Sequence, residues 1–170
     1  MRALSLLFDP RSAIDRRTFW SGLLQLIMLS LVVWLGLTRI GFGAAIAAMP
    51  LAGEALLIGS ASSHGFGSPD MAVTVTTAIA LVAARYYVAV CLMLKRSRHA
   101  GLGPRPAVVF CVASLLAHAL AAAWAWWAQD QDIMVLGPMF ADMAANALIC
   151  ATFLVWLGGR PPHLQVKPAS

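Results

Sequence analysis

Charged residues are scarce in this 170-residue chain: they make up 11% of it, whereas 61% of the residues are apolar. A soluble domain carries about 25% charged and about 45–50% apolar residues. The mean hydropathy of +0.80 departs from such a domain in the same direction. This composition excludes a disordered chain and a classical nucleic-acid-binding protein. A water-soluble globule of this size could not bury so much hydrocarbon, so a lipid bilayer is predicted to surround most of the chain.

Cysteine is also rare, and its pattern excludes two further classes of protein. Cys91, Cys111 and Cys150 lie inside apolar runs, without the spacing of a metal site and in an odd number. A disulfide-stapled fold and a Cys/His metal centre are therefore not expected. The chain also lacks a GxSxG elbow, an HExxH helix and a P-loop. We expect no catalytic residue, no metal and no cofactor.

Four long apolar runs dominate what is present, at residues 18–41, 71–94, 106–127 and 133–157. Each has 20 or more residues, and a helix needs about 20 to cross the hydrocarbon core of a bilayer. The sequence therefore predicts an all-α polytopic membrane domain over residues 1–157, followed by a tail at 158–170. A cleaved signal sequence ending near Ala44–Ala48 is the alternative for the first run, but that run is longer than a usual signal core.

The basic residues are distributed very unevenly between the loops. The loops at 42–70 and 128–132 have no Lys or Arg, whereas the leader, the connection after the second run and the tail hold ten of the twelve. By the positive-inside rule, both termini are predicted to be cytoplasmic and 42–70 is an outer loop. Its first half, Ala44 to Gly59, could form a short helix resting on the outer leaflet. Its second half, Ser60 to Pro69, is rich in turn residues and is expected to be a mobile loop.

A few polar side chains fall inside the predicted helices, where ionisable groups cost about 2.5–3.5 kcal/mol each. At about 1.5 Å of rise per residue, they share the middle third of the membrane. Asp142 and Asn146 lie on one helix face, and small residues near His118 favour close helix packing. We expect Arg85 to pair with Asp142, directly or through water, with Asn146 and His118 nearby and Tyr86 as a further possible partner. This cluster is either a structural ion pair or a proton or solute relay; its members are Arg85, His118, Asp142 and Asn146.

Two stretches carry a resemblance to a known family. The first stretch is Ile14-Asp15-Arg16-Arg17-Thr18-Phe19-Trp20, and it resembles the entry motif I-S-R-x-x-F-W. The second stretch is Arg96 to Pro104, and it is similar to the loop R-L-[HR]-D-x-G-x-S-[GP]. Both motifs belong to domain-of-unknown-function family 805. These YhaH-like proteins lie in bacterial inner membranes, so the resemblance implies that location and four helices, but no chemistry. The chain departs from the family at Ser97, His99, Gly103 and Arg105, and it has no counterpart of the closing G-x-N-x-Y-G segment.

The two stretches are expected to face each other at the cytoplasmic surface, with Gly101 in a left-handed turn. Their arginines form a basic face that either binds anionic lipid headgroups or acts only as a topological signal. We expect a non-enzymatic accessory or scaffold subunit that contacts lipids or a partner membrane protein, and no nucleic acid. The alternative is a small-solute or proton transporter that uses the four mid-membrane residues Arg85, His118, Asp142 and Asn146. The basic face consists of Arg16, Arg17, Arg96 and Arg98.

Overall fold

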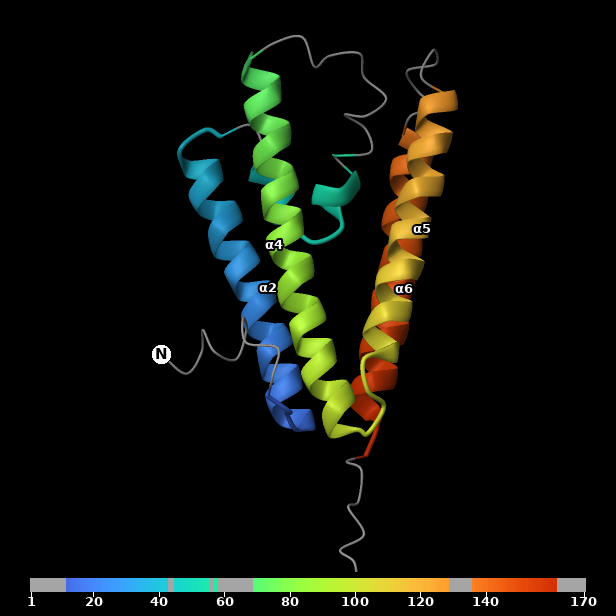
Figure 1. Ribbon diagram of the computed structural model, residues 1–170. Helices are drawn as coiled ribbons and strands as arrows, with labels where there is room; N and C mark the ends of the chain where they lie inside the picture. Colours follow the sequence, from blue (N-terminus) through green and yellow to red (C-terminus); the bar gives the residue numbers. More distant parts are fainter. Residues whose placement is uncertain (1–11, 43–44, 56, 58–68, 129–135, 162–170) are drawn as a thin grey trace, which may run out of the picture.

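Four long helices form the protein in a computed structural model, which describes residues 12–42, 45–55, 57, 69–128 and 136–161 (Figure 1). Among these residues there are helices and no strand. The helices are α2 (Arg16–Arg39), α4 (Pro69–His99), α5 (Arg105–Trp127) and α6 (Leu136–Gly159), with a short 3₁₀ helix, η1 (Ala45–Ala48). All four long helices are long and apolar enough to cross a membrane. The predicted all-α polytopic membrane fold is confirmed.

Most of the helix surface is suited to lipid rather than to water. Large apolar side chains point outward along the helices, among them Leu24, Leu120 and Leu148, which are 61%, 71% and 70% exposed. Such a surface would aggregate in water but is stable in hydrocarbon, where helices also close their backbone hydrogen bonds internally. The chain is therefore a multi-pass membrane protein.

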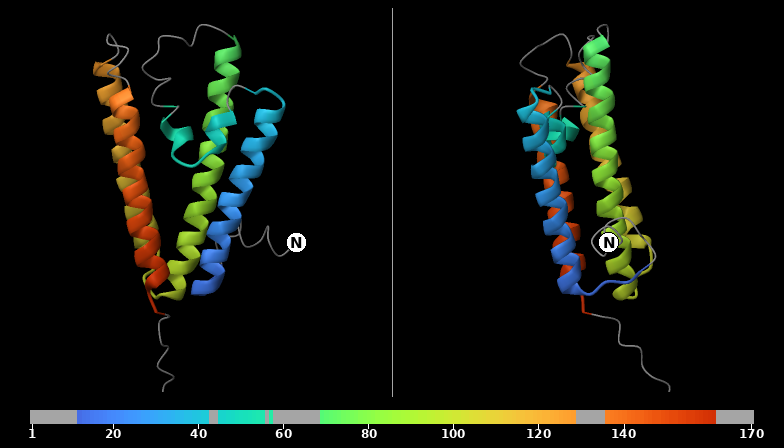
Figure 2. Two further views of the ribbon diagram at one scale, coloured as in Figure 1. Left: turned by 180° about the vertical axis from the view of Figure 1, so that it is seen from behind. Right: turned by 90° about the vertical axis from the view of Figure 1, so that its left-hand side faces the viewer.

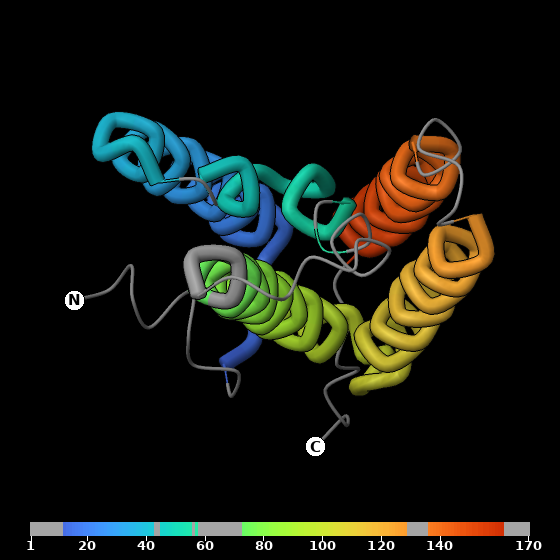
Figure 3. The backbone as a smooth tube through the Cα atoms, turned by 90° about the horizontal axis from the view of Figure 1, so that it is seen from above, coloured from blue at the N-terminus to red at the C-terminus, as the bar shows by residue number. Residues whose placement is uncertain are grey.

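The helices are arranged as two pairs. Figures 1 and 2 show α2 beside α4 and α5 beside α6, with the pairs meeting at one end and diverging toward the other. The end where they meet holds residues 14–20, 96–105 and 157–161, and we call it the basic end. The largest group of buried apolar side chains lies in its half of the bundle and includes Phe19, Leu92, Phe110 and Leu157. The view along the bundle in Figure 3 shows how far α4 and α5 separate at the opposite end.

Local sequence signals fix the turns at the basic end. The Asp15 carboxylate accepts a hydrogen bond of 2.8 Å from the Thr18 backbone N–H and so caps α2. α4 continues to His99, five residues beyond the predicted end, and Gly101 then turns the chain with a φ of 71°. This is the left-handed conformation that glycine adopts without strain. The predicted turn at Gly101 is confirmed.

Part of the 42–70 loop enters the bundle. Residues 45–55 and 57, which we call the inserted segment, comprise η1 and a short helical stretch at 52–55 and 57. Ala47, Glu54 and Ala55 are 0%, 6% and 2% exposed, and Figure 1 shows the segment between the diverging pairs. A Cβ atom at Gly53 would collide with the carbonyl oxygen of Ala47. The expectation that Ala44 to Gly59 rests on the outer leaflet is therefore wrong. Residues 44, 56, 58 and 59 of this stretch, and residues 60–68 of the expected mobile loop, lie outside the described residues.

Candidate functional site

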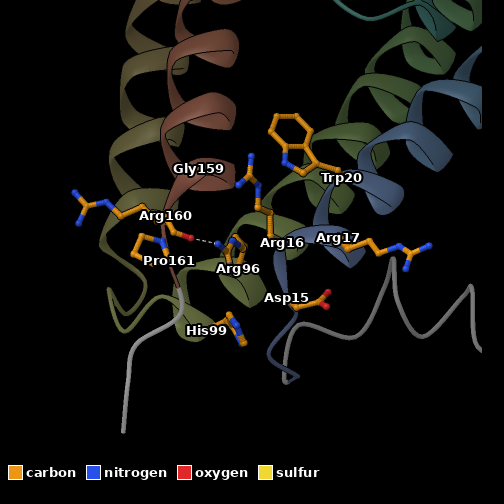
Figure 4. Close-up of a pocket in the computed structure, with 9 residues that line it drawn as sticks. All are labelled: Asp15, Arg16, Arg17, Trp20, Arg96, His99, Gly159, Arg160 and Pro161. Carbon is orange, nitrogen blue, oxygen red and sulfur yellow. Dashed lines mark hydrogen bonds between the residues drawn. The ribbon is translucent and has the colours of Figure 1, made fainter. Parts of the chain in front are cut away.

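A pocket of about 670 Å³ opens at the basic end, between the start of α2, the end of α4 and the end of α6 (Figure 4). The two stretches that resemble family motifs meet here, since the Ile14 backbone N–H donates a hydrogen bond of 3.4 Å to the Lys95 carbonyl oxygen. The prediction that they face each other is confirmed. Cationic, aromatic and backbone groups line the pocket: Asp15, Arg16, Arg17, Trp20, Arg96, His99, Gly159, Arg160 and Pro161.

Arg96 joins the two sides of this pocket. It is only 1% exposed, its Nε donates to the Leu157 carbonyl oxygen at 3.3 Å, and its Nη2 donates to the Arg160 carbonyl oxygen. These two carbonyl groups belong to the last turn of α6 and the residue after it, where no backbone donor remains to bond them. The third nitrogen, Nη1, is buried and has no hydrogen-bond partner among the described residues. An unpaired guanidinium N–H is costly when buried, so this position favours an acceptor.

Positive charge dominates the pocket. Of its ionisable groups, only Asp15 is acidic, and its hydrogen bonds with Thr18 lower the pKa of its carboxyl group, with further help from nearby His99 and Arg96. Asp15 is thus ionised at neutral pH, whereas four arginines line the pocket, of which Arg17 and Arg160 point their side chains away from it (Figure 4). Arg160 also stacks on the Trp156 ring at 4.5 Å, a cation–π contact that leaves its charge uncompensated. Of the predicted basic face, Arg98 lies in the same turn of α4 but does not line the pocket.

A second group of polar side chains lies between α4, α5 and α6. Asp142 and Asn146 on α6 are each 1% exposed, and Ser114 on α5 is 0% exposed. The His118 Nδ1 lies 2.8 Å from Asp142 Oδ1, and its Nε2 lies 2.8 Å from the Tyr86 hydroxyl. The prediction that His118, Asp142 and Asn146 share one site is confirmed. We call these five residues the polar cluster.

The donors in the polar cluster can be assigned one by one. Asn146 Nδ2 faces the Asp142 carbonyl oxygen at 3.1 Å, so its Oδ1 accepts the Ser114 hydroxyl proton at 2.5 Å. Because the Ser114 hydroxyl group already donates to Asn146, the Tyr86 hydroxyl group must donate to Ser114 Oγ at 2.5 Å. Since the Tyr86 hydroxyl group donates to Ser114, it can only accept from His118, so the His118 Nε2–H group must donate to the Tyr86 oxygen.

This assignment leaves one proton between His118 Nδ1 and Asp142 Oδ1. It lies on the histidine, which makes an imidazolium–carboxylate pair, or on the carboxyl group, which leaves both side chains neutral. The pair carries no net charge in either arrangement, as a site inside a membrane requires. Asp142 Oδ1 also accepts a bond of 2.9 Å from Asn146 Nδ2, whereas its buried Oδ2 has no partner among the described residues.

Arg85 is not part of the polar cluster, and the predicted Arg85–Asp142 pair is wrong. Arg85 Nη2 lies 2.5 Å from Glu54 Oε1, and Nη1 donates to the carbonyl oxygens of Ala47 and Ala48 at 3.2 Å each. Neighbouring residues on a helix point about 100° apart, so when Tyr86 turns toward α5, Arg85 turns toward the inserted segment. Glu54 lies in the 42–70 loop, and the distribution of basic residues that predicts an outer loop does not predict that part of it enters the bundle.

The described residues contain no group of three or more His, Cys, Asp or Glu side chains that could hold a metal ion. Their polar groups instead form one pocket lined mainly by basic side chains at the basic end and two buried, charge-balanced clusters deeper in the bundle. Comparison of the chain with protein-family models, curated proteins and solved structures finds no match.

Proposed function

We propose that this chain is a non-enzymatic accessory protein of a bacterial inner membrane that binds anionic lipid headgroups in the pocket at its basic end. The observation that carries the proposal is Arg96 Nη1, a buried cationic donor without a partner among the described residues, in a pocket that three other arginines also line. A lipid phosphate offers several acceptor oxygens and a negative charge, which match this set of donors. Trp20 beside the arginines suits the headgroup level of a membrane.

The location and orientation are part of the proposal. Ten of the twelve basic residues belong to the leader, the α4–α5 connection with the end of α4, and the tail, whereas Arg39 and Arg85 are the exceptions. This bias supports a cytoplasmic basic end and cytoplasmic termini. The inner leaflet of a bacterial membrane is anionic, so the pocket would face its ligand directly.

The resemblance to domain-of-unknown-function family 805 points the same way, and we propose that the chain is a divergent member. The two stretches that carry the resemblance, residues 14–20 and 96–104, supply six of the residues that line the pocket. The residues that would be shared are thus those of the lipid site rather than of the polar cluster.

Replacing Arg16 and Arg17 together by Gln should weaken binding of an anionic lipid. Each basic residue near a charged lipid surface contributes about 1 kcal/mol, so the double variant should lose roughly 30-fold in affinity for dioleoyl phosphatidylglycerol. Titration of the lipid into the protein in detergent micelles, followed by native mass spectrometry, measures this loss. Arg39→Gln, at the opposite end of α2, is the matched control and should bind like the wild type. The proposal would be contradicted if the double variant bound the anionic lipid as tightly as Arg39→Gln does. It would also be contradicted if the wild type bound phosphatidylcholine as tightly as phosphatidylglycerol.

The orientation predicts the outcome of reporter fusions in bacteria. Alkaline phosphatase, which is active only outside the cytoplasm, should be inactive when fused after Ala100 and active when fused after Ser60. A fluorescent protein fused after Ser170 should fluoresce because it would fold in the cytoplasm. An active phosphatase at Ala100 would reverse the orientation and place the pocket on the wrong side of the membrane.

A proton relay is the second candidate function, and the single proton held between His118 and Asp142 favours it. Liposomes containing the purified protein should then show proton flux that Asp142→Asn abolishes, at an unchanged level of folded protein. Absence of flux in wild-type liposomes would leave the polar cluster with a purely structural role.

A further inference from the structure

A second cavity, of about 810 Å³, lies between α4 and α5, away from the basic end. Its volume is within the range of about 300–1,000 Å³ that holds one small ligand. Along α4 its lining runs from Ile79 to Val90, which corresponds to about 16 Å of helix. Aliphatic side chains and alanines form most of its walls, including Val82 and Ala83 on α4 and Leu115 and Ala119 on α5.

The cavity is reached from the membrane rather than from water. Ile79 and Leu115, one on each wall, are 54% and 65% exposed on the apolar surface of the bundle. These walls belong to the stretches of α4 and α5 that cross the membrane. A molecule that enters between them therefore comes from the hydrocarbon phase and carries an apolar chain.

Besides the Cys111 thiol, four side chains with polar groups line this otherwise apolar cavity: Glu54, Tyr86, Tyr87 and His118. Both nitrogens of His118 are engaged, and the Tyr86 hydroxyl donates its proton to Ser114, which leaves it only an acceptor lone pair. Glu54 is 6% exposed; its Oε1 pairs with Arg85, and its buried Oε2 has no partner among the described residues. Glu54, Tyr86 and His118 thus offer acceptors and no free donor, and the half-exposed Tyr87 already has an interaction of its own.

Charge balance defines the ligand further. Arg85 neutralises Glu54, and the single proton in the polar cluster neutralises Asp142. A charged headgroup would add an unpaired charge at this depth, which is costly, so the site favours a neutral ligand. The headgroup must instead supply the donor that Glu54 Oε2 lacks.

We propose that this cavity binds an uncharged lipid with an apolar chain and a hydroxyl head, and that the hydroxyl group donates a hydrogen bond to Glu54 Oε2. A matching lipid with a methoxy head accepts hydrogen bonds but cannot donate one, so it leaves the carboxylate oxygen unsatisfied. The site is independent of the basic pocket and of its anionic ligand.

The test offers the purified protein in detergent an equal mixture of 1-octadecanol and 1-methoxyoctadecane, which have the same alkyl chain. Native mass spectrometry separates the two adducts by mass. A donor to a carboxylate that is otherwise unpaired should favour the alcohol by on the order of tenfold. Equal amounts of the two adducts on the wild type would overturn the proposal.

Glu54→Gln should reverse this preference. Its amide oxygen must face the Arg85 donor, so its NH₂ group takes the place of Oε2 and donates to the ether oxygen. The variant should therefore bind the methoxy lipid at least as well as the alcohol. A retained tenfold preference for the alcohol in a folded Glu54→Gln variant would show that Glu54 does not select the headgroup.

If Glu54→Gln does not fold, a variant with a blocked cavity tests whether the two lipids bind in this cavity. Ala119→Phe places a ring in the wall of the cavity without touching a polar group, and it should lose most of both adducts. Leu116→Phe is the control, because Leu116 is 58% exposed on the same helix and does not line the cavity. Wild-type levels of both adducts on Ala119→Phe would mean that the lipids bind elsewhere.

Discussion

A charge cannot remain unpaired in hydrocarbon, and the contact between Arg85 and Glu54 is how this chain meets that constraint. Because Arg85 is in a membrane-spanning helix, its counter-ion must lie at the same depth inside the bundle. The 42–70 loop does this by entering the bundle, where Glu54 and the carbonyl groups of Ala47 and Ala48 bond the guanidinium group. The inserted segment then lies between the two helix pairs (Figures 1 and 3), and its residues Glu54 and Leu57 line the cavity between α4 and α5. The segment that carries this buried ion pair thus occupies the space in which the two helix pairs diverge.

The polar cluster meets the same constraint by a different route. It relies on shared protons rather than on a long cation: five side chains from three helices hydrogen-bond to one another, and the pair of His118 and Asp142 is neutral however its proton is placed. Such bonds fix the register of α4, α5 and α6, because they connect Tyr86, Ser114 and Asn146 across the three helices. Among the described residues, the other arginines lie near the ends of the helices, where lipid phosphate groups and water are available as partners in a membrane.

The helices were predictable because long apolar runs in a membrane leave the backbone no alternative. The cap at Asp15, the turn at Gly101 and the meeting of His118 with Asp142 and Asn146 followed from rules that act within a turn or between helices of similar depth. The partner of Arg85 did not follow from such rules. Depth along a helix says nothing about a loop that folds back into the membrane, and the alternating Ala, Gly and Leu residues around Glu54 show no helical period. The partnerless Nη1 of Arg96 likewise depends on how α4 meets the end of α6.

A double-mutant cycle on Arg85 tests the central claim most directly. The unfolding free energy in detergent would be measured for Arg85→Gln, Glu54→Gln and Asp142→Asn, and for Arg85→Gln combined with each of the other two. If Glu54 is the counter-ion, the first combination should be non-additive by about 1 kcal/mol or more, because the pair is already broken in either single variant. The combination with Asp142→Asn should be closer to additive. Additivity with Glu54→Gln and strong coupling to Asp142→Asn would contradict this account.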